Sequence, residues 1–206
     1  MKTIKTIVIV VATAFLMIGC RATIHVSSSI SDLAMLQLRI NRDVSVRLEV
    51  VSNIQDGETI IMNEAGTART RIVMMNQGTV LRRMVYDYMS AKFSRLYETG
   101  ELRITVRLNE FTIRDFPTES TGTQVLRALG GTTAGQSRMV SVRQTASIEV
   151  VGIDINEFRN FSSTSEEHYT GELSSPVANR TLQRAANEVN NRLLMQMGAF
   201  FNEIGI

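Results

Sequence analysis

The first twenty residues constrain this chain most, because they combine a positive start, a short apolar run and the only cysteine among 206 residues. Lys2 and Lys5 supply the positive charge, and the run from Ile7 to Ile18 contains no charged residue. The run is too short to span a bilayer, which needs roughly 20 apolar residues. This order of features is typical of an export signal, so we expect residues 1–19 to be removed.

The residues around the cysteine predict how export ends. Gly19 precedes Cys20 where an ordinary secreted protein would carry an A-x-A-like cleavage site. The segment Leu16-Met17-Ile18-Gly19-Cys20 resembles the lipobox of bacterial lipoproteins, with its leucine one position earlier than is usual. The resemblance implies cleavage between Gly19 and Cys20 and acylation of Cys20. In the same resemblance, Arg21 in place of aspartate favours sorting to the outer membrane rather than retention at the inner membrane.

Processing also changes the charge. Loss of Lys2 and Lys5, with no acidic residue in the signal, takes the formal net charge from +2 to 0. A neutral domain without a basic block has no electrostatic footprint for nucleic acid. It also lacks a polybasic second anchor, so membrane attachment is expected from the acyl chains alone, at about 0.8 kcal/mol per buried CH₂. With Cys20 acylated, stability must come from an apolar core, for which about 187 residues suffice.

Alternation of apolar and polar residues predicts the strands. The clearest are at 44–52, 101–116 and 139–153. A third long strand is expected at 157–172, where Phe158, Phe161 and Tyr169 stand in a Ser/Thr-rich context typical of a solvated face or a sheet edge. The alternation changes phase at Asn109-Glu110, which predicts a β-bulge inside the second of these strands or a bend of its second half.

The weaker segments carry other expectations. A further β-prone stretch lies at 69–75, and residues 53–67, rich in Asn, Asp and Gly, are expected to form a loop. Residues 21–43 are expected to be a tether followed by a short edge strand or extended arm, because Leu36, Leu38 and Ile40 alternate with polar residues.

Two segments have helical periodicity. An apolar stripe predicts a helix over 77–97, with Gly100 as its C-terminal stop. A second stripe predicts a helix of about 28 residues that Ser175 caps and Pro176 begins.

The resulting order, β-α-β-β-β-α, predicts an α+β two-layer sandwich: a mostly antiparallel sheet with two amphipathic helices on one face. The chain would divide into a signal at 1–19, a lipidated N-terminus and arm at 20–43, and a single domain at 44–206.

No motif indicates catalysis. The only histidines are His25 and His168, and neither belongs to a metal-ligand or nucleophile motif. Glu166-Glu167-His168 is a poor coordination site, because adjacent residues of a strand point to opposite faces. Asp115, like the other carboxylates at strand ends, is expected to be solvated. We therefore expect no enzyme, no metal and no cofactor.

The connection at 117–138 is longer than an ordinary hairpin loop, and such loops are usually functional or disordered. Within it, Val125, Leu126 and Leu129 form a small apolar patch around Arg127. Contact of this tip with a partner or a lipid is one expectation. A mobile loop capped by a short helix is the alternative.

The whole pattern resembles small outer-membrane lipoproteins of the YajG type, the LPS-assembly lipoprotein LptE and the auxiliary lipoproteins of lipid-transport systems. The local likeness to the YajG type lies in Ala22-Thr23-Ile24-His25-Val26, in the strand Thr145–Val150 and in the helix Ala185–Asn190. The resemblance implies a fold more than a function.

Three functions follow as hypotheses. The leading one is a lipid-anchored, non-catalytic periplasmic domain that scaffolds or assists an envelope complex, through a protein partner or a homo-oligomer. The alternative is a module that binds a lipid or glycolipid between sheet and helices. A hydrolase is the third, and it would need a polar pocket that the sequence does not show.

The lipobox yields a direct test. Replacement of Cys20 by alanine should abolish labelling with palmitate and release the protein from the membrane fraction, because the acyl chains have no other attachment point. Metabolic labelling followed by membrane fractionation measures both. A C20A variant that still labels and stays in the membrane would contradict the assignment.

Overall fold

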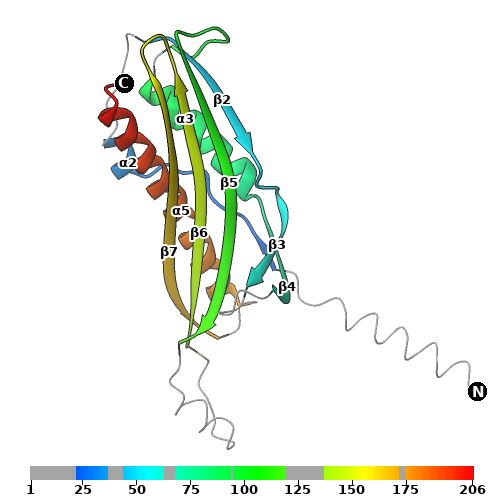
Figure 1. Ribbon diagram of the computed structural model, residues 1–206. Coiled ribbons are helices and arrows are strands. Elements are labelled where there is room, and N and C mark those ends of the chain that lie inside the picture. Colours follow the sequence, from blue (N-terminus) through cyan, green and yellow to red (C-terminus); the bar gives the residue numbers. More distant parts are fainter. Residues whose placement is uncertain (1–21, 37–43, 63–67, 94, 119–136, 172–174) are drawn as a thin grey trace, which may run out of the picture.

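The protein forms one seven-stranded sheet with its helices packed on one face, as Figure 1 shows for this computed structural model. The structure describes residues 22–36, 44–62, 68–93, 95–118, 137–171 and 175–206. The elements are β1 (Ala22–Ile24), α2 (Asp32–Leu36), β2 (Val46–Ser52), β3 (Gly57–Met62), β4 (Ala68–Met75), α3 (Gln77–Lys92), β5 (Leu102–Pro117), β6 (Ser137–Val151), β7 (Asn156–Thr170) and α5 (Pro176–Glu203). The predicted α+β architecture is confirmed.

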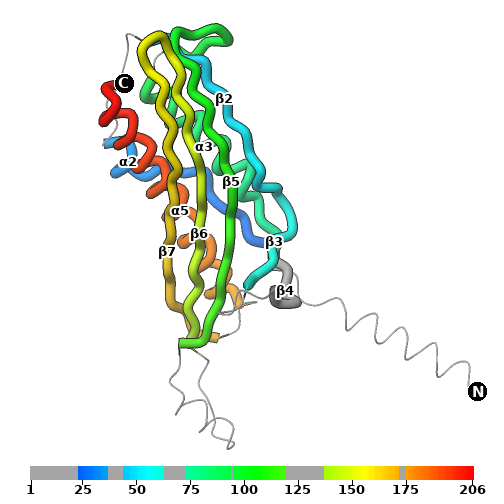
Figure 2. The backbone as a smooth tube through the Cα atoms, in the orientation of Figure 1, coloured from blue at the N-terminus to red at the C-terminus, as the bar shows by residue number. Residues whose placement is uncertain are grey.

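Three long antiparallel strands form the centre of the sheet. β5, β6 and β7 follow one another as a meander, and Figure 2 shows them running side by side over most of the molecule. On the other side of β5, two shorter strands share one edge: β2 pairs parallel with its first half and β3 with its second half. β4 and then β1 extend the sheet beyond β3. The sheet is therefore mixed but mostly antiparallel, as its long alternating strands predicted.

The predicted bulge is present in β5. The register with β6 shifts between Leu108 and Glu110, so Asn109 is the extra residue. Gln144 of β6 lies opposite this point and is fully buried. Its side-chain amide donates to the carbonyl oxygens of Glu110 (2.8 Å) and Thr145 (3.1 Å). The bulge thus places a glutamine inside the core with its donors satisfied.

The same glutamine connects the sheet to both helices. Gln77, in the first turn of α3, donates from Nε2 to Gln144 Oε1 (3.3 Å) and to Asn190 Oδ1 (2.7 Å) of α5. All three side chains are at most 1% exposed. Buried amides that are fully paired specify one relative position of the elements that carry them, because any shift leaves a polar group unsatisfied.

The loop predicted at 53–67 was wrong for residues 57–62, and residues 63–67 lie outside the described part. Residues 57–62 form β3, which pairs antiparallel with β4 and places Ile61, at 0% exposure, against β5. At the start of the segment, Asp56 accepts from the amide of Thr79 (3.1 Å) at the beginning of α3. Gly57 follows with a φ of 117°, a conformation that favours glycine.

The helix predicted to reach residue 97 ends at Lys92 instead. The chain then runs alongside β2: the amide of Val46 donates to the carbonyl of Arg95, and the amide of Tyr97 donates to the carbonyl of Val46, both at 2.9 Å. Gly100 is therefore not a helix stop. A Cβ there would lie 2.5 Å from the backbone nitrogen of Arg47, so glycine is required for the close approach of two backbones.

The segment expected to be a tether and arm contains two elements. β1 pairs parallel with β4, and Ile24 and Val26 are buried in the core. Asn76 holds this segment by accepting from the amide of Val26 (2.7 Å). Leu36 ends the helix α2, where alternation predicted an extended chain, and residues 37–43 lie outside the described part.

The long C-terminal helix was predicted correctly. Ser175 caps it by accepting from the amide of Ala178 (3.2 Å), and Pro176 occupies its first turn. The helix runs across the inner faces of β6 and β7 (Figure 1). Among the residues that the structure describes, no helix is both long and apolar enough to cross a membrane.

One contact between the two long helices is unusually tight. Tyr88 of α3 is fully buried, and its hydroxyl finds no hydrogen-bond partner among the residues that the structure describes. Burial raises the pKa of this phenol to about 12. A Cβ added at Gly198 of α5 would lie 2.1 Å from that hydroxyl, whereas the nearest ring carbon is 3.3 Å away. The hydroxyl therefore selects glycine at this position.

This contact predicts that the effect of Gly198→Ala on the free energy of unfolding changes sign when the hydroxyl of Tyr88 is removed. Gly198→Ala should destabilise the protein by about 1–3 kcal/mol, because overpacking costs more than the helix gains. In a Tyr88→Phe background the same change should be neutral or stabilising by up to about 1 kcal/mol, the usual gain of alanine over glycine in a helix. Urea unfolding of the two single variants and the double variant measures the coupling. Equal effects of G198A in both backgrounds would contradict the contact.

Candidate functional site

The residues singled out by sequence lie outside the part that the structure describes. This holds for Gly19 and Cys20 of the processing site and for Val125, Leu126, Arg127 and Leu129 of the long loop. Their roles stay predictions. The described residues that flank the long loop show how its two ends are held.

The long loop departs from a firmly bonded end of the sheet. Arg138 of β6 donates to Asp115 of β5 through two parallel bonds, from Nε to Oδ1 (2.9 Å) and from Nη2 to Oδ2 (2.7 Å). Tyr169 of β7 donates its hydroxyl to the same Oδ1 (2.9 Å). One carboxylate therefore joins the three long strands where the loop begins.

Electrostatics at this cluster follow from its burial. Asp115 is 1% exposed, and its hydrogen bonds raise the pKa of Arg138 above the usual range. Burial and the neighbouring carboxylate of Asp115 raise the pKa of Tyr169, because both disfavour a phenolate. The cluster thus holds a fixed ion pair and a neutral tyrosine, an arrangement that fastens strands.

The expectation that Asp115 is solvated was wrong. Its burial could have been predicted from the alternation of β5. Asp115 is two residues after Ile113, so both side chains point to the same face of the strand, toward the core. Beyond it, Thr118 and Ser137 close the ladder with a backbone bond (3.1 Å) and a hydroxyl bond (2.8 Å). The loop is therefore presented from a rigid base.

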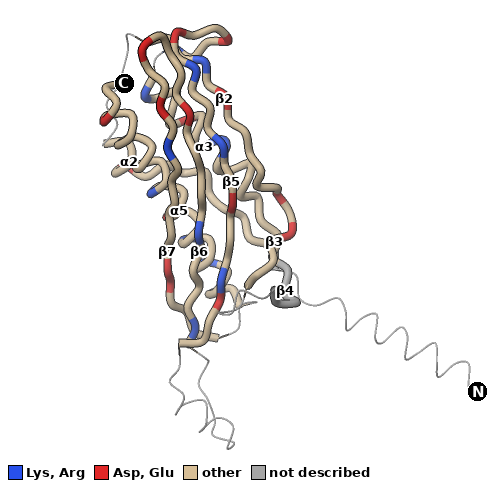
Figure 3. Tube along the Cα trace, viewed as in Figure 1, with Lys and Arg blue, Asp and Glu red and all other residues tan. Residues whose placement is uncertain are grey.

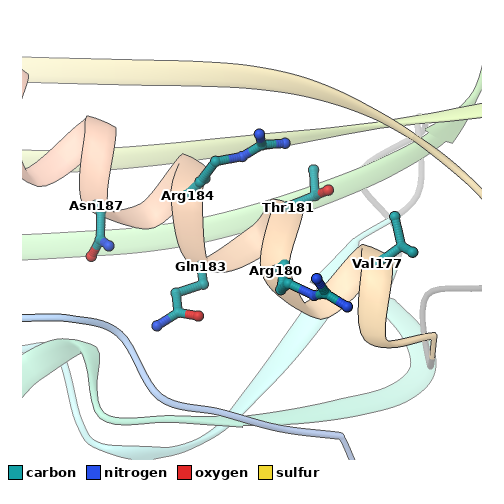
Figure 4. Close-up of a pocket in the computed structure, with 6 residues that line it drawn as sticks. All are labelled: Val177, Arg180, Thr181, Gln183, Arg184 and Asn187. Carbon is teal, nitrogen blue, oxygen red and sulfur yellow. The ribbon is translucent and has the colours of Figure 1, made fainter.

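A groove of about 420 Å³ lies along the first half of α5. Its lining residues are Val177, Arg180, Thr181, Gln183, Arg184 and Asn187. Figure 4 shows that Arg180, Gln183 and Asn187 point to one side of the helix, whereas Thr181 and Arg184 point to the other. Arg184 is engaged by Glu167 of β7 (3.3 Å). Side chains that diverge in this way do not converge on a reacting atom, so the groove has the character of a surface contact.

The histidines do not form a site. His25 is exposed, and so is His168 on β7. Within the described ranges, no three His, Cys, Asp or Glu side chains gather closely enough to hold a metal ion. Figure 3 shows acidic and basic positions interspersed along the long strands, so the sheet carries no block of a single sign.

Comparison with known proteins locates the chain only at the level of fold. No family model and no curated protein matches it. Among solved structures, it is similar to a DUF330-family protein from Xanthomonas campestris, with a TM-score of 0.49, 8% identity, and coverage of 90% of this chain and 97% of that one. It is also similar to the rare lipoprotein B from Shewanella oneidensis, with a TM-score of 0.46, 10% identity, and coverage of 81% and 100%.

A minor lipoprotein from Acinetobacter baumannii is a more distant match, with a TM-score of 0.36 and 14% identity over 74% of this chain and 92% of that one. Likeness at these levels concerns the course of the backbone. The chain thus resembles several bacterial proteins, two of them named lipoproteins, in the arrangement of its sheet and helices.

Breaking the buried ion pair of Asp115 and Arg138 should cost more stability than breaking an exposed ion pair elsewhere in the protein. Asp115→Asn should destabilise the protein by about 3 kcal/mol, because it leaves the guanidinium of Arg138 buried without its carboxylate. The control is Glu203→Gln, which breaks the exposed bidentate pair with Arg159 and should shift the melting temperature little. Thermal unfolding at neutral pH compares the two. Similar shifts for both variants would show that the Asp115 cluster does not fasten the strands.

Proposed function

We propose that this chain is a lipid-anchored, non-catalytic periplasmic domain that scaffolds or assists an outer-membrane assembly or transport complex. The role corresponds to that of the YajG and LptE-like lipoproteins that the sequence resembles. The partner would be an envelope protein or a second copy of the chain.

One observation carries the proposal most directly: the fold begins almost at the lipobox cysteine. β1 starts at Ala22, only two residues after Cys20, and Ile24 is already buried. Two residues span at most about 7 Å. An acylated Cys20 would therefore hold the sheet directly at the bilayer surface and restrict its orientation. A domain held in this way can present the same surfaces to a membrane complex at all times.

The packed interior favours surface contacts over a ligand held between the layers. On the inner face of the sheet, Ile104, Val106, Ile113 and Ile148 have no exposed area, and Leu193 of α5 is likewise at 0% exposure. Side chains thus fill the space in which the alternative function would place a lipid. The long loop and the faces and edges of the sheet then provide the contact surfaces.

The test combines crosslinking with two alterations. Full-length protein crosslinked mildly in membranes should recover a specific envelope partner, and deletion of residues 122–136 should lose it. The E203Q variant, changed far from this loop, should retain it. An insertion of about twelve Gly and Ser residues between Arg21 and Ala22 should preserve palmitate labelling but weaken crosslinking, since a flexible linker removes the fixed height above the bilayer.

Two results would contradict the proposal. The first is recovery of the chain only as a lone monomer. The second is added mass beyond the acyl anchor in native mass spectrometry of the extracted protein, which would favour the lipid-binding alternative.

A further inference from the structure

The outer edge of β2 has backbone groups that face away from the rest of the sheet. The amide of Leu102 donates to the carbonyl of Ser45 (3.1 Å), and the amide of Asn53 donates to the carbonyl of Leu108 (2.9 Å). Odd-numbered residues of β2 therefore bond to β5. Because strand residues alternate, the even-numbered residues direct their N–H and C=O groups outward.

The first of these outward residues is already paired. Val46 bonds through both its N–H and its C=O to residues 95–97, which lie parallel to it. The next two, Leu48 and Val50, have no backbone partner among the described residues. The added strand at this edge thus stops after a single residue pair.

The opposite edge of the sheet is treated differently. β7 is the last strand, and side chains of α5 reach around it to occupy its carbonyls: Arg192 donates to Thr164 (2.7 Å) and Gln196 donates to Ser162 (3.2 Å). Covering an edge in this way prevents unwanted pairing. α5 therefore satisfies two carbonyls of β7, whereas a short stretch of β2 stays open among the described residues.

A groove of about 600 Å³ lies beside this open stretch. It is lined by Arg47, Leu48, Glu49, Tyr86, Leu96, Tyr97, Glu98 and Thr99. Two tyrosines give it an aromatic character, since Tyr97 is 55% and Tyr86 is 40% exposed. Open backbone groups and a pocket for side chains thus occur together.

We infer that an extended segment of a protein partner adds to β2 at Leu48 and Val50 and places an apolar side chain in the groove beside Tyr86 and Tyr97. The chemistry selects this occupant, because only an extended polypeptide offers N–H and C=O groups at the spacing of a strand. The inference rests on the proposed function, which it deepens by naming a surface and the form of the partner.

The test uses peptides as defined probes. Random octapeptides displayed on phage are selected on the full-length protein in detergent, and an enriched peptide is synthesised. When it binds, hydrogen exchange at the amides of Leu48 and Val50 should slow by about tenfold or more, because both amides gain an acceptor.

Two pairs of variants, each with a control on β7, distinguish loss of the binding surface from a general effect of the substitution. Val50→Pro removes one outward N–H of β2, and Ser162→Pro removes one from the other edge strand, a position that tolerates proline. Tyr97→Ala removes one ring of the groove, and Phe158→Ala removes a ring of similar exposure (60% against 55%) from β7. V50P and Y97A should weaken peptide binding by about tenfold, whereas S162P and F158A should bind as the parent does. Y97A leaves the strand intact if V50P fails to fold.

Three outcomes would overturn the inference: no enriched peptide, a bound peptide that leaves both amides unchanged, or protection of these amides that depends on protein concentration without peptide. The last would assign the edge to a second copy. If the peptide experiment fails but crosslinking still recovers a partner, the β2 surface is refuted and the proposed function stands. If a peptide binds but crosslinking recovers no partner, the proposed function is refuted and the β2 surface stands.

Discussion

The buried amide of Gln144 is the interaction on which the arrangement of layers depends. It satisfies the carbonyl that the β-bulge leaves inside the core and, through Gln77, reaches Asn190 of the long helix. An apolar core alone would allow the helices to slide over the sheet at little cost. A polar group that lost its partner would cost about 1–3 kcal/mol, so the network selects one position. The bulge, which interrupts the alternation of β5, is thus the origin of the register between sheet and helices.

A sheet covered on one face has consequences for the remaining surfaces. The helices leave the other face of the sheet to solvent, and the edge strands β7 and β2 differ in how their outward backbone groups are paired. α5 satisfies carbonyls of β7 with Arg192 and Gln196, whereas β2 pairs outward only at Val46. The end of the sheet near the long loop is fastened by Asp115, which joins β5, β6 and β7. Firm bonding at the centre of the sheet therefore coincides with an open stretch of backbone at its margin.

β1 incorporates the start of the described chain into the sheet. It pairs parallel with β4, and Ile24 and Val26 are buried in the core. Under the proposed function, an anchor at Cys20 would lie only two residues from this fixed strand, so the backbone between them would have almost no length to reorient.

Sequence alone determined the elements whose signals are local. Period-two alternation located β5 and β6 and even the bulge at Asn109, and Ser175 with Pro176 located the start of α5, because these patterns need only the geometry of one segment. The lipidation of Cys20 stays a prediction from a local motif. Tertiary structure decided whatever depends on a distant partner. Ile61 forms a strand only because β5 covers it, α3 ends at Lys92 because residues 95–97 pair with Val46, and Asp115 is buried because Arg138 and Tyr169 compensate its charge. Segments of weak intrinsic preference take the conformation that their neighbours stabilise, and those neighbours are not adjacent in the sequence.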